Sequence, residues 1–506
     1  MPLRPIAMEN MHLQQEGHTK VHVKSCILWM FPLLFAFSSS VTADEGRYQD
    51  YVVGARAMGL GGAFTAIADD SSGVFYNPAG IVDVRKGSLS ISTSLYGLEF
   101  SGVSMTDSSA LERRLRSGVS SADVIIIPSA TGGVRGLGKP LENGSYRHAV
   151  AFGTIVPQYT SRFVDTEQVD GDTNLLTRFR SSVYDRTLHA GAAYAYRAGR
   201  WFRLGASLHY ILRSLNSDET LVTRDEQDFG RFQVAESQLR SRTHSARASF
   251  GFKFHPGPRW TFGGSVTTPS MGIWRSVAFL ATEVSSNSSD ENDRPELTVL
   301  TYENDKFDLG SHLPGKLRMG FAFTEPANFT LAADLIFYGP SEYDIISNEV
   351  LEQPGAGARL SQVPIPLRIR RNTIGNACIG VEKLVSSRVS VSVGLFTNFT
   401  SAEPLEYTTT SDGTKVLTNS STRLSNVHMA GGSFSVGFFN DNSLSRLGVT
   451  GSAGLGETVV PLAPELRFGE TDASLQVIDS AESYIYIFWS STFRYGKGKR
   501  KRGLSF

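Results

Sequence analysis

The sequence is poor in cysteine and has no hydrophobic run long enough to cross a membrane as a helix. Two of its 506 residues are cysteines, and the longest apolar run, residues 26–37, has twelve residues. A membrane-spanning helix needs about 20 residues. These absences exclude a helical membrane protein with several spans and a fold held together by several disulfides.

The sequence also lacks an excess of charge and the motifs of the common enzymes. Lysine plus arginine and aspartate plus glutamate each number 49, so the formal net charge is zero and predicts no nucleic-acid partner. There is no Gly-x-Ser-x-Gly elbow, no His-Glu-x-x-His, no Cys/His metal spacing and no Walker loop. We therefore expect no enzyme, no cofactor and no bound metal.

The first 43 residues have the pattern of a secretory signal peptide. Lys20 and Lys24 precede the short apolar run, and small residues ending at Ala43 follow it. Removal of this segment takes Cys26 with it, so Cys378 becomes the single thiol of the mature chain. Because Cys378 lies in an apolar stretch, we expect a small buried or lipid-facing side chain rather than a reactive one.

Alternation of apolar and polar residues is the dominant pattern after residue 87. On residues 201–213, Phe202, Leu204 and Leu208 share one face, whereas Arg203 and His209 share the other. An apolar face opposite a polar one suits the wall of a membrane barrel with a wet lumen. A soluble exported β-sandwich would show the same alternation, so a single strand does not decide between them.

The spacing of the strands favours the barrel. Short turns alternate with polar stretches at residues 214–240, 283–311, 340–363 and 402–424, which are longer than loops of compact soluble domains. We expect an all-β fold, a transmembrane antiparallel β-barrel of about 14 strands. The predicted strands are 88–95, 124–132, 146–156, 187–197, 201–213, 246–254, 259–267, 316–324, 329–338, 372–383, 388–398, 427–439, 446–454, 465–478 and 484–495.

A glycine-rich segment, residues 54–81, precedes the strands. Its glycines do not form a dinucleotide-binding loop, because Phe64 stands where that motif requires glycine or alanine and no strand precedes it. Residues 64–68 are too short for a stable free helix and must pack against something larger. Asp69 and Asp70 suit a cap or turn, and Asn77-Pro78 ends and turns the chain.

This segment resembles the N-terminal hatch of FadL-type outer-membrane transporters of long-chain fatty acids and other hydrophobic compounds, including variants found in spirochaetes. The resemblance rests on residues 54–59, 68–70 and 76–80, and recurs at residues 313–320, 331–335, 379–382 and 393–396. It implies a fourteen-stranded barrel with a small helical plug, the hatch, in its lumen. The implied organisation is signal peptide 1–43, hatch 44–86, barrel 87–495 and a basic C-terminal tail 496–506.

The resemblance also implies a function in the cell outer membrane. A hydrophobic ligand such as a long-chain fatty acid would bind passively in the lumen and leave when the hatch rearranges, or sideways through the wall. The implied hatch and gating residues are Asn77, Pro78, Ala79, Asp69, Asp70, Gly61 and Gly62. The alternative is a barrel of the same fold that serves as a scaffold or shuttle for secretion or surface assembly without solute transport.

Several cations on the polar strand faces are candidates to hold the head group of such a ligand. Alternatively, they pair with acidic neighbours and hold the wall together. These candidates are Arg203, His209, Arg213, Arg247, Lys253 and Arg318. The expected partners are outer-membrane lipids and, during biogenesis, the barrel-assembly machinery, with the mature protein a monomer.

Overall fold

The computed structural model describes residues 46–48, 52–104, 125–142, 144–169, 175–225, 231–287, 296–306, 312–326, 328–344, 368–410, 415–418, 424–461 and 475–495. The predicted signal peptide and C-terminal tail lie outside these residues. No helix within them is long and apolar enough to cross a membrane.

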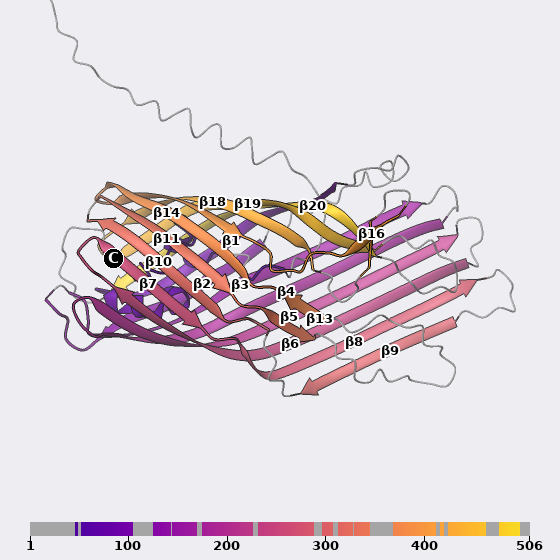
Figure 1. Cartoon of the computed structure of the whole chain (residues 1–506), viewed down its shortest axis with the longest axis horizontal. Helices are drawn as coiled ribbons and strands as arrows, with labels where there is room; N and C mark the ends of the chain where they lie inside the picture. Colours follow the sequence, from indigo (N-terminus) through magenta and orange to yellow (C-terminus); the bar gives the residue numbers. More distant parts are fainter. Residues whose placement is uncertain are drawn as a thin grey trace, which may run out of the picture. The chain divides into compact units, whose positions relative to one another are not determined.

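The strands close into a 14-stranded antiparallel barrel (Figure 1), which confirms the predicted fold class. The first and last strands pair with each other and complete the ring. Around the ring the wall strands are β1 (Gly87–Ser104), β2 (Ile125–Leu137), β3 (His148–Val169), β4 (Leu175–Arg197), β5 (Phe202–Asp225), β6 (Arg231–Phe254), β7 (Trp260–Thr267) continued by β8 (Met271–Asn287), β10 (Lys316–Glu325), β11 (Phe329–Tyr338), β14 (Ile374–Ser386), β15 (Val389–Asn398), β18 (Asn426–Phe439), β19 (Ser443–Pro461) and β20 (Leu475–Tyr495).

Short turns lie at one end of the barrel, which we call the short-turn end. Residues 198–201, 255–259 and 440–442 join neighbouring strands there. Gly87 pairs with Tyr495 at this end, so the wall begins and finishes on the same side. This is the arrangement expected of an even-stranded barrel.

Two of the predicted polar loops are largely strand. Residues 214–225 and 231–240 extend β5 and β6, and residues 296–306 form β9 (Glu296–Lys306), which pairs with β8. Figure 1 shows these long strands running past the ends of β7, β10 and β11. The prediction failed because both faces of these segments carry polar residues, so they lack the apolar stripe by which a wall strand is recognised.

In the other two predicted loops, the described residues form short strands. β12 (Ser341–Asp344) pairs with β13 (Arg368–Arg371), and β16 (Tyr407–Thr409) pairs with β17 (Lys415–Leu417). Tyr343 of β12 packs with Leu215, Leu239 and Val277 on the inward face of the extended strands. Of the predicted strand 465–478, residues 475–478 begin β20, and residues 465–474 lie outside the described residues.

The alternation of the wall is as predicted. On β6, Phe250, Phe252 and Phe254 are exposed outward, while Ser249 and Lys253 are buried inward. From Phe254 to His244 the strand rises roughly 33 Å. At a typical tilt this corresponds to about 25 Å of height, the thickness of the apolar band of an outer-membrane barrel.

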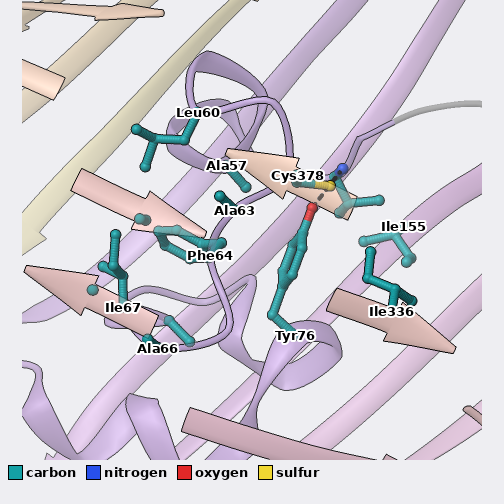
Figure 2. Packing of buried hydrophobic residues seen from close by; sticks show 14 of the residues in the cluster. Ala57, Leu60, Ala63, Phe64, Ala66, Ile67, Tyr76, Ile155, Ile336 and Cys378 are labelled. Atoms are coloured by element: carbon teal, nitrogen blue, oxygen red, sulfur yellow. Dashed lines mark hydrogen bonds between the residues drawn. The ribbon is translucent and has the colours of Figure 1, made fainter. Parts of the chain in front are cut away.

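Residues 52–86 lie inside this wall, and we call them the inner segment. Their elements are α2 (Ala55–Gly59), α3 (Gly73–Tyr76) and the 3-10 helix η2 (Pro78–Asp83). Residues 64–68 form a hydrogen-bonded turn, from Ala68 N to the Phe64 oxygen, and pack against wall residues as predicted. Figure 2 shows Tyr76 beside Cys378 and Ile336 of the wall, with Phe64 on its other side.

The inner segment touches the wall through a belt of glycines. A Cβ on Gly205 would lie 2.4 Å from Ala79 N, and one on Gly394 would lie 2.1 Å from Gly61 N. Several of these glycines pair across neighbouring strands, for example Gly263 with Gly320. The wall glycines that meet the inner segment are Gly132, Gly153, Gly191, Gly205, Gly251, Gly263, Gly320, Gly380 and Gly394. Their missing side chains make room for the backbone of the inner segment at some positions and for its side chains at others.

Candidate functional site

A cavity lies between the inner segment and the wall. Phe75 and Tyr76 line it from α3, and His189, Arg247 and Tyr338 line it from β4, β6 and β11. It encloses about 560 Å³ of empty space, part of it open to solvent. Its other lining residues are Tyr48, Val53, Ile155, Pro157, Gln158, Leu313, Pro314, Lys316 and Arg318.

Three cations face this cavity, and none of its described lining residues is acidic. Arg247 contacts the His189 ring nitrogen Nδ1 at 3.3 Å, Lys316 lies 5.9 Å from the centre of the Tyr338 ring, and Arg318 lies 4.8 Å from that of Tyr76. Lys316 and Arg318 are two residues apart on β10, so both face inward. The arrangement provides positive charge beside apolar and aromatic surface.

A second cavity adjoins the first. Tyr76, Arg318 and Tyr338 line both, so these side chains stand at the junction. The second cavity also contacts Met58 and Phe396 and encloses about 650 Å³, part of it open to solvent. Its side chains are mostly neutral, in contrast to the three cations of the first cavity.

Cys378 is buried and lines the second cavity. Its sulfur would lie 3.3 Å from a Cβ on Gly62, so the inner segment covers the thiol. The burial predicted for this residue is confirmed, and it faces the lumen.

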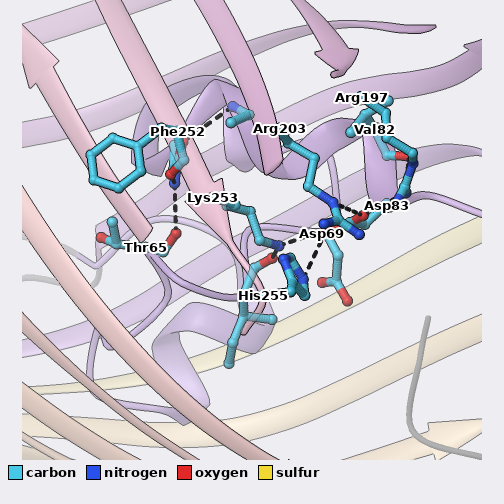
Figure 3. Close-up of polar contacts among 12 residues, drawn as sticks. Thr65, Asp69, Val82, Asp83, Arg197, Arg203, Phe252, Lys253 and His255 are labelled. Carbon is cyan, nitrogen blue, oxygen red and sulfur yellow. Dashed lines mark hydrogen bonds and ion pairs between the residues drawn. The ribbon is translucent and has the colours of Figure 1, made fainter. Parts of the chain in front are cut away.

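Two predicted head-group residues instead bind the inner segment. Arg203 Nε lies 3.0 Å from Asp83 Oδ1, and Lys253 Nζ lies 2.9 Å from Asp83 Oδ2. Arg197 donates to the same carboxylate at 2.7 Å, and His255 lies 3.8 Å away (Figure 3). Burial alone raises the pKa of Asp83, but the surrounding cations outweigh it and hold the pKa well below its usual range. These cations fasten the end of η2 to the wall.

Two other predicted residues have wall partners. Arg213 donates to both oxygens of Asp185, at 3.1 and 2.7 Å, and to the Tyr343 hydroxyl at 2.9 Å. His209 is buried, with its Nε2 2.8 Å from Ser207 Oγ and its ring 5.2 Å from the ring of Phe75. Of the six predicted cations, therefore, only Arg247 and Arg318 line the cavity.

The predicted hatch turn is tightly held. Asn77 is fully buried and donates through Nδ2 to the Thr65 and Phe252 carbonyls, at 3.0 and 2.9 Å. Its Oδ1 accepts from Ala79 N at 3.1 Å and caps η2, with Pro78 at the first position. The expected end and turn of the chain at Asn77-Pro78 is confirmed.

The remaining predicted hatch residues have structural partners. Asp70 Oδ1 accepts from Ser72 N at 2.8 Å, which confirms the expected turn. Burial raises the pKa of Asp70. Asp69 Oδ1 accepts from Arg56 at 2.9 Å. Gly61 and Gly62 have φ angles of +63° and +95°, the region that favours glycine.

A buried ion network joins α2 to the wall. Arg56 Nε lies 2.9 Å from Glu382 Oε2, and Arg446 pairs with Glu382 Oε1. Glu382 is completely buried and Arg446 nearly so. Arg446 also donates to Ser392 and Ser435, at 2.7 and 3.1 Å. Since the residues are far apart in sequence, this network was not predicted.

Lys316 is the cavity cation that the sequence analysis missed. Lys316 lies on the same face of β10 as Arg318, which was predicted as a head-group residue. The alternation along the strand therefore identifies Lys316 as well. Tyr48 also lines the cavity and stacks on Tyr338 at 4.8 Å between ring centres. No periodic signal marks Tyr48, because it precedes the strands.

Comparison with solved structures identifies related folds. The toluene transporter TodX of P. putida matches with a TM-score of 0.53 and 14% identity, over 88% of this chain and 99% of its own. The monoaromatic hydrocarbon channel CymD matches with a TM-score of 0.50 and 13% identity, over 88% and 98%. A Pseudomonas aeruginosa FadL homologue matches with a TM-score of 0.50 and 12% identity, over 89% and 100%.

These likenesses confirm the FadL-type fold predicted from the N-terminal motif. No protein-family model and no curated protein matches the sequence.

Proposed function

We propose that this chain is an outer-membrane transporter that binds hydrophobic solutes carrying an anionic group, such as long-chain fatty acids. The observation that carries the proposal is the cavity lined by Arg247, Lys316 and Arg318, with apolar and aromatic side chains and no described acidic residue. The printed names of solved structures with the same fold, a toluene transporter and a hydrocarbon channel, support a hydrophobic solute.

The chemistry of the two adjoining cavities suits an amphiphile. The three cations attract a carboxylate, and the second cavity, in which Arg318 at the junction is the single charged lining residue described, takes the chain. Each buried CH₂ contributes about 0.8 kcal/mol, so a few methylene groups give useful affinity without an energy source. Net movement then follows the concentration gradient and trapping of the solute downstream.

The outward apolar band supports the membrane location. Its height matches the hydrocarbon core, and short turns of such barrels face the periplasm. In this orientation the short-turn end, where Asp83 meets Arg203 and Lys253, is the periplasmic mouth. Export through a cleaved signal peptide, residues 1–43, belongs to the same proposal.

Release requires the inner segment to move, because it fills the lumen. Its polar contacts with the wall include those of Asp83, Asn77 and the Arg56–Glu382 pair. In addition, Asp334 of β11 accepts hydrogen bonds from Phe64 N and Thr65 N. We propose that binding of the solute beside Tyr76 disturbs the packing of α3 and loosens these contacts. The alternative path is sideways, where the β2–β3 ladder ends at Ile155.

Binding of a fluorescent long-chain fatty acid to the refolded protein tests the proposal. The parent should bind it saturably, and should bind its uncharged methyl ester more weakly. Substitution of both Lys316→Gln and Arg247→Gln should lower the affinity for the acid at least about tenfold, because hydrogen bonds to charged groups contribute roughly 1.5–3 kcal/mol. The affinity for the ester should be nearly unchanged.

Arg135→Gln provides the matched control. Arg135 pairs with Val150 on the outward face of β2, away from the cavity, and its loss should leave both affinities unchanged. Absence of saturable binding by the parent would overturn the transport proposal and favour a scaffold or shuttle. Equal affinities for the acid and the ester would overturn the proposed recognition of an anionic head group but not the binding of a hydrophobic solute.

A further inference from the structure

A group of outward-facing arginines lies just beyond the apolar band, at the end opposite the short turns. Arg186, Arg240 and Arg242 belong to the parts of β4 and β6 that extend past the band. Arg240 and Arg242 are exposed and Arg186 is half-buried. We call these three residues the arginine patch.

The strand register places the patch on the outer surface. Arg186 pairs with Ser214, Ser214 with Arg242, and Arg242 with Ser276. In the next row, Asn216 pairs with Arg240. Paired residues share a face. The outward position of this row follows from the neighbouring inward row, in which Arg213 binds Tyr343 inside the barrel.

The three arginines lie close enough to act together. Arg186 and Arg242 are separated by one intervening strand, a distance of about 10 Å, and Arg240 is about 7 Å along the strand from Arg242. Their neighbours on β5 and β8 are short and neutral: Ser214, Asn216, Ser276 and Ala278. On β9 the same two rows continue to Asp305, opposite Ser276, and Glu303, opposite Ala278, so the three arginines lie on β4 and β6 and the acidic positions lie at the β9 side of the patch.

An aromatic cluster marks the adjacent level as the membrane boundary. Tyr210 and Trp274 are exposed, the Tyr210 hydroxyl contacts His244 Nδ1, and the His244 and Trp274 rings lie 4.9 Å apart. His244 immediately precedes the patch on the outward face of β6, and Trp274 pairs with it. Aromatic girdles of this kind sit at the level of the lipid head groups.

We propose that the arginine patch binds the phosphate groups of lipids in the leaflet at this end of the barrel. Arginine matches phosphate by paired hydrogen bonds, and three arginines directly above the girdle lie where those phosphates are. The inference rests on the proposed membrane location but not on the nature of the transported solute. The patch would fix the depth of the barrel and gather anionic lipid around its rim.

Tryptophan quenching by brominated lipids tests this inference. In one mature protein, which lacks residues 1–43, Trp274 is kept and the other three tryptophans are replaced by Phe, so the reporter lies beside the patch. In a second protein Trp260, near the short-turn end, is the only tryptophan. Each is refolded into phosphatidylcholine bilayers containing a minor fraction of brominated phosphatidylglycerol or brominated phosphatidylcholine.

Trp274 should be quenched by the phosphatidylglycerol as though that lipid were enriched at least about threefold around it, because each arginine near the surface attracts anionic lipid. Trp260 should not distinguish the two lipids to this extent. The triple substitution Arg186→Gln, Arg240→Gln and Arg242→Gln should abolish the enrichment at Trp274. A triple substitution at the short-turn end, Arg135→Gln, Arg200→Gln and Arg388→Gln, should leave it unchanged.

The outcomes separate the possible failures. Equal quenching of Trp274 by both lipids, or enrichment that survives the patch substitutions, would overturn the inference. Loss of enrichment on addition of inorganic phosphate, but not of chloride at equal ionic strength, would assign the patch to a soluble anion instead. If neither lipid quenches Trp260, the membrane location itself fails.

Discussion

The ion network around Glu382 should hold the inner segment in place, and the substitution Glu382→Gln should release it. Glu382 is completely buried between Arg56 of α2 and Arg446 of β19. Replacing it with glutamine retains the shape of the side chain but removes the charge between the two guanidinium groups. The barrel ladder of β14 is not altered, so the effect should concentrate on the attachment of α2.

The size of the effect follows from the partners that remain. Removing one member of a buried ion pair typically costs about 3–5 kcal/mol. Arg56 would keep Asp69, and Arg446 would keep Ser392 and Ser435, so we expect the lower value, about 3 kcal/mol. Since about 1.4 kcal/mol is a factor of ten, the open population should rise about 100-fold.

Labelling of Cys378 by a maleimide measures this population. The thiol is covered at Gly62 and is the only one left after removal of residues 1–43, so labelling reports uncovering. Lys415→Gln, which removes partly exposed pairs with Glu457 and Asp479, is the control and should change the rate less than about fivefold. An unchanged rate in Glu382→Gln, with heat-modifiable gel mobility retained, would refute the role of the network. Loss of that mobility would show that the substitution also unfolds the barrel, and would refute an effect limited to the inner segment.

Three further substitutions address the same attachment. Gly394→Ala places a Cβ 2.1 Å from Gly61 N and should also speed the labelling of Cys378. Gly257→Ala is the control, because Gly257 has open space around it, and it should leave the labelling rate unchanged. Equal labelling rates in the two variants would contradict the contacts between the wall glycines and the inner segment. Asn77→Ala removes hydrogen bonds to two carbonyls, so the inner segment should detach at a lower temperature than the one at which the barrel unfolds. Labelling of Cys378 at increasing temperature should show this detachment as a separate, earlier transition. A single transition shared with the barrel would contradict this expectation. The pKa of Asp83 lies below that of an unfolded aspartate, about 3.9, so its stabilising effect is complete above that pH and is lost as the pH falls through the lowered value. The difference in stability between the parent and Asp83→Asn, measured by thermal unfolding at each pH, should therefore stay constant from about pH 8 to about pH 5. It should become smaller only in stronger acid. A difference that already becomes smaller between pH 7 and pH 5 would contradict the lowered pKa of Asp83.

The wall could be predicted from the sequence because its signal is local. Each wall strand alternates apolar and polar residues, as in Phe250, Phe252 and Phe254 of β6. The strand extensions beyond the apolar band carry polar residues on both faces, so their sequence lacked this signal. β9 was missed for the same reason.

The site was only partly predictable, because charge partners depend on contacts across the barrel. Arg203 and Arg247 look alike in the sequence, yet Arg203 binds Asp83 and Arg247 faces the cavity. The belt of wall glycines was also invisible, since each is ordinary within its own strand. The N-terminal motif indicated where the chain turns at Asn77, but not which wall residues would receive it.

A crystal structure with a brominated long-chain fatty acid tests the central claim most directly, because anomalous scattering locates the bromine. The account predicts the carboxylate within hydrogen-bond distance of Lys316 or Arg247 and the bromine in the second cavity, near Phe396. A fatty acid found only on the outer wall, with both cavities unchanged, would contradict it.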